Sequence, residues 1–150
     1  MEPVRAVDDG HCFACGPFNE DGLKLRFERD GPDGARSDLT IDPKFQGYRD
    51  VAHGGIVMML LDEVMAHASG MVGEKAMTAS VNVRFRKPVP TGQPLTLRGK
   101  VLWQRRRVIA IEGFVIDAEG EVLASAEGSF VTQGHIEPGP LSNMQAGETV

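Results

Sequence analysis

The sequence has little of several features that would assign it to a specialised class of protein. It has only two cysteines, Cys12 and Cys15, which are too few for a disulfide framework and too close for an unstrained bridge. No stretch reaches the roughly 18 apolar residues that span a bilayer, and the first residues lack a secretory signal pattern. The net charge of −5 leaves no broad basic surface for nucleic acid. We therefore expect a cytoplasmic protein with free thiols that binds neither membranes nor nucleic acid.

The length of 150 residues suits one domain with one sizeable core. Residues 133–150 contain two prolines, three glycines and few large apolar side chains, so burial there offsets little of the entropy lost on ordering. We expect a single domain over residues 1–132 and a flexible C-terminal tail over residues 133–150.

Hydrophobic periodicity predicts an α+β fold. Residues 23–27 and 35–41 alternate between apolar and polar, so they predict a hairpin, and the irregular residues 42–53 follow. Residues 54–70 are apolar on nearly all sides of a helix, which is typical of a helix buried in a core. Four further strands are predicted as an antiparallel meander over residues 77–87, 95–103, 108–116 and 122–131. With one helix available to cover the apolar face, the sheet should curl around it.

Asp62 and Glu63 are the acidic residues of this apolar helix, and a buried carboxylate needs a partner or a polar cleft. Glu63 can pair with His67 four residues on, or face solvent. Asp62 has only methionine and alanine at the neighbouring helical positions, so its partner must lie outside the helix unless it sits at a solvent-facing edge. We therefore treat Asp62 as the candidate catalytic carboxylate.

The helix begins after His53, with Gly54 and Gly55 in its first turn. Unshielded backbone N–H groups at a helix N-terminus can polarise a carbonyl group, although a glycine before a helix is also common in ordinary structures. Gly54 and Asp62 lie about 12 Å apart along the helix axis, too far to act on one carbonyl. If both act on one substrate, they must come from two subunits, which predicts a homodimer.

The strand over residues 77–87 places five polar side chains on one face if its alternation is regular: Thr78, Ser80, Asn82, Arg84 and Arg86. This face is either a solvated surface or a path from a reacting centre at Thr78 towards ligand phosphates near Arg84, Arg86 and Lys87. Cys12 and Cys15 follow His11, but structural zinc usually takes four ligands and no second cysteine pair exists. We therefore expect no metal site.

Residues 45–69 and 76–95 resemble the hotdog-fold thioesterase superfamily, particularly its phenylacetate-degradation-type and THEM-like acyl-CoA thioesterases. The resemblance rests on His53-Gly54-Gly55 with an acid nine residues after the histidine, on Thr78-x-x-x-Asn82, and on the following Lys87-Pro88. The opening HCFACGPFNEDGLKLRF also looks like the entry segment of such proteins, so the resemblance covers about residues 10–131.

The resemblance implies a hotdog fold, in which a curved antiparallel sheet of five to six strands wraps around one long central helix. It implies an acyl-CoA thioesterase that releases free acid and CoA, with CoA as part of the substrate and no other cofactor. The Gly54 N–H would polarise the thioester carbonyl, Asp62 of the partner subunit would act on the same carbonyl, and Thr78 and His53 would shape the site. Contacts to CoA would come from Asn82, Arg84, Arg86 and Lys87. The assembly would be a homodimer, further paired into a dimer of dimers.

Several alternatives stay open at this stage. Asp62 can attack the carbonyl directly or activate water, and Glu63 is a minority candidate for the acid. Some relatives carry Asn at the position of Gly47, where Gln46 is a possible substitute. A non-catalytic acyl-CoA-binding protein and an enoyl-CoA hydratase also remain, although hydration wants an Asp–His pair and His67 lies five residues from Asp62 on the helix.

Overall fold

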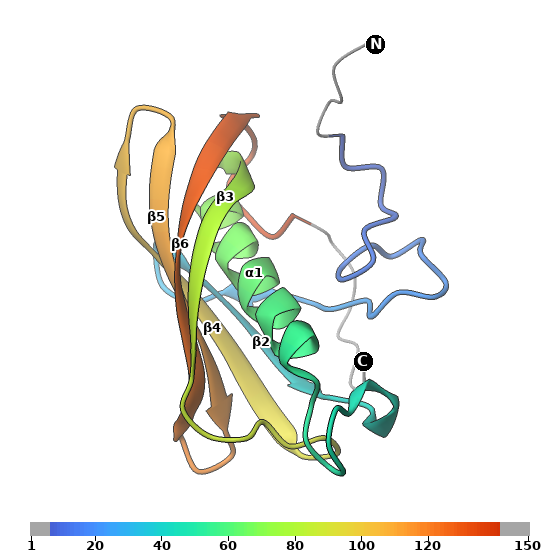
Figure 1. Ribbon diagram of the computed structural model, residues 1–150. Coiled ribbons are helices and arrows are strands. Elements are labelled where there is room, and N and C mark those ends of the chain that lie inside the picture. The colour runs from blue at the N-terminus through green and yellow to red at the C-terminus, as the bar shows by residue number, and fades with distance from the viewer. Residues whose placement is uncertain (1–6, 142–150) are drawn as a thin grey trace.

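A long helix lies in the concave face of an antiparallel sheet in the computed structural model, which describes residues 7–141 (Figure 1). The helix is α1 (Gly54–Met71), and a short 3-10 helix, η1 (Pro43–Phe45), precedes it. The strands are β1 (Glu28–Arg29), β2 (Gly34–Thr40), β3 (Glu74–Phe85), β4 (Pro94–Arg105), β5 (Val108–Asp117) and β6 (Val122–His135). They form one six-stranded sheet in the order β1-β2-β4-β5-β6-β3. The expected architecture, a curved sheet around one central helix, is confirmed.

Helix α1 supplies the centre of the core. Leu60, Leu61, Val64 and Met65 are each 0% exposed, because the sheet curves around the apolar segment that the sequence places here. Strand β4 approaches the helix so closely at Gly99 that a Cβ there would lie 2.6 Å from the carbonyl oxygen of Val64. The close approach fixes the orientation of α1 relative to the sheet, and hence the direction in which its polar residues point.

The four long strands expected after the helix are present, but their order differs from a simple meander. Strands β4, β5 and β6 are sequential neighbours, whereas β3 pairs with β6 and not with β4. The expectation of a four-strand meander was therefore wrong in the placement of β3, because residues 86–93 carry the chain across the end of the sheet rather than through a tight turn. Within residues 7–141, β3 has a strand on only one side, so it forms an edge of the sheet.

The strand predicted over residues 23–27 is not part of the sheet, and only Glu28 and Arg29 pair with β2. The alternation was nevertheless correct for burial, because Leu23, Leu25 and Phe27 all lie in the core. The backbone N–H of Leu25 donates to the carbonyl of Ala14 at 2.9 Å, so the segment is fixed by the N-terminal loop instead of by a strand. Alternating burial predicts which side chains face inward, but it does not specify the backbone partner.

The C-terminal part of the described chain continues beyond the expected boundary at residue 132. Strand β6 extends to His135, and the N–H groups of Ile136 and Gly139 then donate to the carbonyls of Gly73 and Gly70, each at 2.9 Å. The rest of the expected tail, residues 142–150, lies outside the described residues. Among the described residues, no helix combines the length and apolar character needed to cross a membrane.

Candidate active site

The hydrogen-bond partner of Asp62 lies outside the helix, as we expect from the sequence. The Thr78 hydroxyl on β3 donates a 2.6 Å hydrogen bond to Oδ1 of Asp62. Burial raises the pKa of Asp62, the hydrogen bond from Thr78 lowers it and the neighbouring Glu63 carboxylate raises it, so the net direction is upward. The arrangement gives a carboxylate that is more basic than a solvated one and is held in a fixed orientation.

Asp62 and Thr78 both line an open cavity of about 880 Å³, which we call the Asp62 cavity. Its walls come from four parts of the chain, namely the N-terminal loop, α1, the first half of β3 and residues 136–141. Glu63, Cys12 and Cys15 lie in the same walls. The cavity therefore combines the candidate carboxylate with residues that sequence analysis did not connect to it.

A second candidate site lies at the N-terminal end of α1, away from Asp62. His53 is the N-cap residue, and its Nδ1 accepts a hydrogen bond from the Gly55 N–H at 2.9 Å. Gly54 occupies the first helical position, where the backbone N–H has no acceptor within the helix. It lines a cavity of about 260 Å³, the Gly54 cavity, together with Arg86 and Lys87. This N–H group would be accessible to an oxyanion or a carbonyl oxygen of a bound molecule.

The two cavities share no lining residue among those described. The structure therefore places Gly54 and Asp62 in separate cavities of one chain, consistent with their spacing of about 12 Å along the helix. A single chain does not bring the helix N-terminus and the carboxylate onto one reacting group.

The prediction that five polar residues share one face of β3 was wrong. A β-bulge at Ala79 inserts one residue between Thr78, which lies opposite Phe130, and Ser80, which lies opposite Ser129. Residues directly opposite each other in an antiparallel pair point to the same face, and the Phe130 side chain is fully buried under α1. Thr78 therefore faces the helix, whereas Ser80 lies on the outer face, because one extra residue reverses the alternation.

The bulge also moves two of the predicted CoA contacts away from Asp62. Asn82 and Arg84 lie opposite Glu127 and Ser125, on the outer face of the sheet. Together with Arg86 they line a groove there of about 410 Å³, which we call the outer groove. Of the four residues expected to contact CoA, the structure brings only Arg86 and Lys87 next to Gly54.

Glu63 pairs with His67 as predicted, with 3.6 Å between His67 Nε2 and Glu63 Oε2. His67 is fully buried and its ring stacks on Phe27, with 3.9 Å between the ring centroids. The other Glu63 oxygen, Oε1, lies 3.9 Å from the Sγ of Cys12. This contact could not be predicted from the sequence, because the two residues are 51 positions apart and no local pattern links them.

Gln46, considered as a substitute for a family asparagine, has a local role. Its side-chain Oε1 accepts a hydrogen bond from the backbone N–H of Asp50 at 3.2 Å. This bond closes the loop before α1, and Gln46 is absent from the linings of both cavities.

Comparison with known proteins identifies relatives of the whole fold. The family model described as the thioesterase superfamily matches residues 50–124. A protein of Saccharolobus solfataricus that is provisionally named an esterase is 35% identical over 95 residues, which cover 62% of this chain and 67% of the relative. A second protein of that organism with the same provisional name is 24% identical over 111 residues, 73% of each chain.

Solved structures give the same grouping. The crystal structure of the thioesterase superfamily protein RHA08564 has a TM-score of 0.77 at 30% identity and covers 87% of this chain and 68% of that one. A Streptococcus mutans protein bound to acetyl-CoA has a TM-score of 0.70 at 18% identity, covering 75% and 91%. The E. coli PaaI protein of the phenylacetic acid degradation operon has a TM-score of 0.70 at 19% identity, covering 77% and 83%. The last two likenesses show the fold alone.

Proposed function

Because this chain belongs to the thioesterase superfamily, we propose that it hydrolyses an acyl-CoA thioester to a free acid and CoA, with Asp62 as the catalytic carboxylate. The observation that carries the proposal is the 2.6 Å hydrogen bond from Thr78 to Asp62 at the wall of the Asp62 cavity. Asp62 thus has a fixed orientation and space beside it for a substrate, and its burial gives it a raised pKa.

The bond from Thr78 occupies Oδ1 of Asp62 and leaves Oδ2 for the reacting group. Asp62 either accepts a proton from water as the water attacks the carbonyl carbon, or attacks that carbon itself to form a mixed anhydride that water then cleaves. In both routes the carbon–sulfur bond breaks, the CoA sulfur leaves as a thiol and water supplies the acid oxygen. The raised pKa of Asp62 favours either role, because a more basic carboxylate is both a better base and a better nucleophile.

The backbone N–H of Gly54 in one subunit would polarise the substrate carbonyl that is held beside Asp62 of the other subunit. Strand β3 runs from Thr78 beside Asp62 to Phe85, whose ring lies 3.7 Å from the Cβ position of Gly54. If two copies pair antiparallel along the free edge of β3 near Val81 and Asn82, Thr78 of one copy meets Phe85 of the other. The Asp62 cavity of one subunit then adjoins the Gly54 cavity of its partner. The exposed side chains of Met77 (52%) and Phe85 (53%) support burial of this edge.

This pairing also suggests which end of the Gly54 cavity faces CoA. Arg86 and Lys87 line that cavity, so in the dimer they would lie on the side of the carbonyl where the pantetheine arm leaves, and their long side chains would point along the arm towards the CoA phosphates. Asn82 and Arg84 would contact CoA only where it passes around the edge of β3 into the outer groove. His53 would hold the first turn of α1 in place through its bond to the Gly55 N–H.

Release of CoA thiol from a panel of acyl-CoAs tests the activity. We expect Asp62→Asn to remain folded and to lose hydrolysis, whereas the exposed turn residue Glu119→Gln, which also removes one carboxylate, should behave as the parent protein. Full activity in Asp62→Asn would refute the assignment of this residue. Tight acyl-CoA binding by the parent protein without turnover would favour the alternative of a non-catalytic binding protein.

Complementation between two inactive variants tests the shared site. Gly54→Pro removes the N–H at the first helical position, where proline is tolerated, and the His53 backbone at φ −57° and ψ 135° suits a residue before proline. Random mixing with Asp62→Asn makes half of the dimers mixed, and each mixed dimer has one intact site, so activity should return to about a quarter of the parent value. No recovery after confirmed subunit exchange would contradict a site built from two chains.

The hydratase alternative is weakened by the placement of His67. This histidine is fully buried against Phe27 and pairs with Glu63, and it does not line the Asp62 cavity. Hydrolysis needs no such histidine, so the arrangement favours thioester cleavage.

A further inference from the structure

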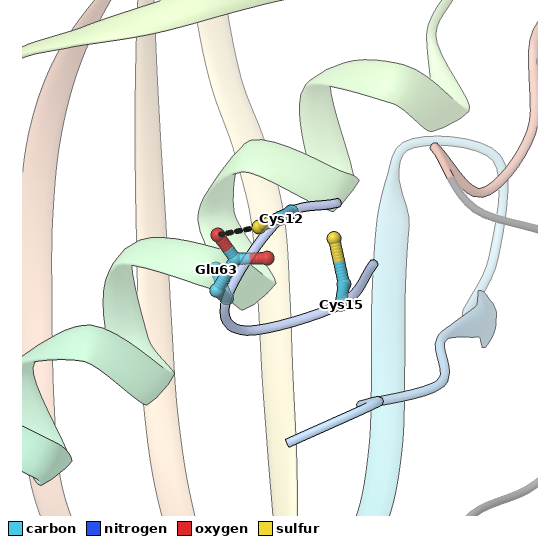
Figure 2. Close-up of side chains that lie close together, drawn as sticks. All are labelled: Cys12, Cys15 and Glu63. Atoms are coloured by element: carbon cyan, nitrogen blue, oxygen red, sulfur yellow. Dashed lines mark hydrogen bonds between the residues drawn. The ribbon is translucent and has the colours of Figure 1, made fainter. Parts of the chain in front are cut away.

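A group of three potential metal ligands lies in the wall of the Asp62 cavity but is not used by the proposed reaction. Figure 2 shows the side chain of Cys12 on the N-terminal loop beside Glu63 on α1, with the side chain of Cys15 next to them. The two sulfurs and a Glu63 carboxylate oxygen all lie within 4.8 Å of one another. We call these three residues the thiol–carboxylate cluster.

The loop that carries the thiols is fixed by its own backbone. The Gly16 N–H donates to the Cys12 carbonyl at 2.8 Å, and a Cβ on Gly16 would lie 2.3 Å from the Cys12 nitrogen, so only glycine fits this turn. The N–H of Leu23 also donates to the Phe13 carbonyl at 2.9 Å. The two sulfurs are therefore positioned over the helix by hydrogen bonds that need no ion, which reduces the entropy lost on binding one.

Glu63 lies between His67 on one side and Cys12 on the other. The backbone N–H of Leu141 donates to Nδ1 of His67 at 3.3 Å, and Nε2 of His67 lies 3.6 Å from Glu63 Oε2. This contact is too long for a hydrogen bond, and Nε2 of His67 has no hydrogen-bond partner among the described residues. His67 nevertheless occupies the space on one side of Glu63, while Oε1 is directed at Cys12 on the other side.

The cluster places two thiols and one carboxylate together at the cavity wall. Burial raises the pKa of the Cys15 thiol, and the nearby Glu63 carboxylate and Cys12 raise it further. A divalent cation reverses this balance, because it stabilises both thiolates and the carboxylate together.

We propose that Cys12, Cys15 and Glu63 bind one Zn²⁺ ion, with a fourth coordination position open to the Asp62 cavity. Two S–H bonds break, two zinc–sulfur bonds and one zinc–oxygen bond form, and two protons are released. Because two protons leave as one doubly charged ion enters, the net charge of the cluster does not change. Two thiolates on a tetrahedral zinc lie about 3.7 Å apart, so the side chains need to move by about 1 Å or less.

Zinc is favoured over a hard cation such as Mg²⁺ because two of the three ligands are sulfur. The ion would fix the N-terminal loop to α1 beside Asp62, whatever thioester the cavity accepts. The proposal therefore stands apart from the proposed hydrolysis, and the two can fail separately.

Cobalt substitution tests the site in the full-length chain, stripped of metal and kept reduced with a thiol-free reductant. We expect one Co²⁺ per chain, with the thiolate-to-cobalt charge-transfer band and the intense visible bands of a tetrahedral site, and displacement of Co²⁺ by Zn²⁺. Zn²⁺ should also raise the melting temperature of the parent protein.

Two neighbouring carboxylates provide matched variants. Glu63→Gln keeps the shape of the side chain but removes a ligand, and we expect at least about 10-fold weaker metal binding. Asp62→Asn should keep metal binding while it loses hydrolysis, which separates this inference from the proposed function. Cys12→Ser, at the less buried of the two cysteines, should lose the thiolate–cobalt band while its circular dichroism spectrum remains that of the parent.

Three results would overturn the proposal. One is no metal bound at one equivalent per chain by the reduced parent protein. Another is cobalt binding that persists unchanged in both Glu63→Gln and Cys12→Ser, which would place the metal elsewhere. The third is quantitative formation of a Cys12–Cys15 disulfide in air that zinc does not prevent, which would make the pair a redox couple.

Discussion

Replacing Thr78 with valine removes the hydroxyl group that donates to Asp62. Valine has nearly the same shape and suits a strand, so β3 should form normally. The lost bond is 2.6 Å long and ends on a carboxylate. Hydrogen bonds to charged groups contribute about 1.5–3 kcal/mol, and the exposure of Thr78 favours the lower end of this range. If the bond positions Asp62 in the transition state, kcat/KM should therefore fall by about 10-fold.

The same substitution should shift the pH dependence of hydrolysis. The reaction needs ionised Asp62, so activity is lost as pH falls through the pKa of this group. The Thr78 hydroxyl lowers that pKa by donating to the carboxylate, so Thr78→Val should raise it and move the acidic limb of the kcat/KM profile to higher pH. Steady-state release of CoA thiol measured across the acidic range gives both quantities.

Two matched variants complete this experiment. Thr78→Ser keeps the hydroxyl and should retain most of the activity. Thr96→Val removes a similar bond, 2.7 Å long, from the Thr96 hydroxyl on β4 to Asp38 on β2, and should leave both kcat/KM and the pH profile unchanged. An unchanged profile and full activity in Thr78→Val would refute the role given to this hydroxyl.

Three further substitutions test the fold and the cost of the site. Asp62→Asn should raise the melting temperature at neutral pH, because a carboxyl group whose folded pKa is raised destabilises the folded state above that pKa. The difference between variant and parent should vanish below the unfolded pKa, and a variant that melts with the parent at both pH values would contradict this. Gly99→Ala should destabilise the protein by about 1–3 kcal/mol in chemical denaturation, because its Cβ would lie 2.6 Å from the Val64 carbonyl oxygen, and parent-like stability would show that β4 can move away from α1. Thr132→Val removes a 2.6 Å bond to the buried Glu74 carboxylate and should cost about 1–3 kcal/mol of unfolding free energy, whereas Thr132→Ser should cost less.

Much of the fold could be predicted from local pattern. The apolar segment after His53 forms α1 within one residue of the expected end, and the four long strands appear where alternation places them. Asp62 could be predicted as a functional residue because a charged group in a buried helix needs a partner, and that requirement does not depend on the fold. Helical spacing placed His67 within reach of Glu63, and the structure shows this pairing rather than the alternative of solvent exposure.

The sequence by itself determined the periodicities and the one carboxylate that its own helix could not satisfy, because both depend on residues a few positions apart. Only the tertiary structure decided that Ala79 forms a bulge, that Thr78 therefore faces Asp62, and that Asn82 and Arg84 face the other way. It also decided that Cys12 and Cys15 lie against Glu63. These features depend on pairing with β6 and on how a loop docks on a helix, and such long-range contacts leave no periodic signal in the chain.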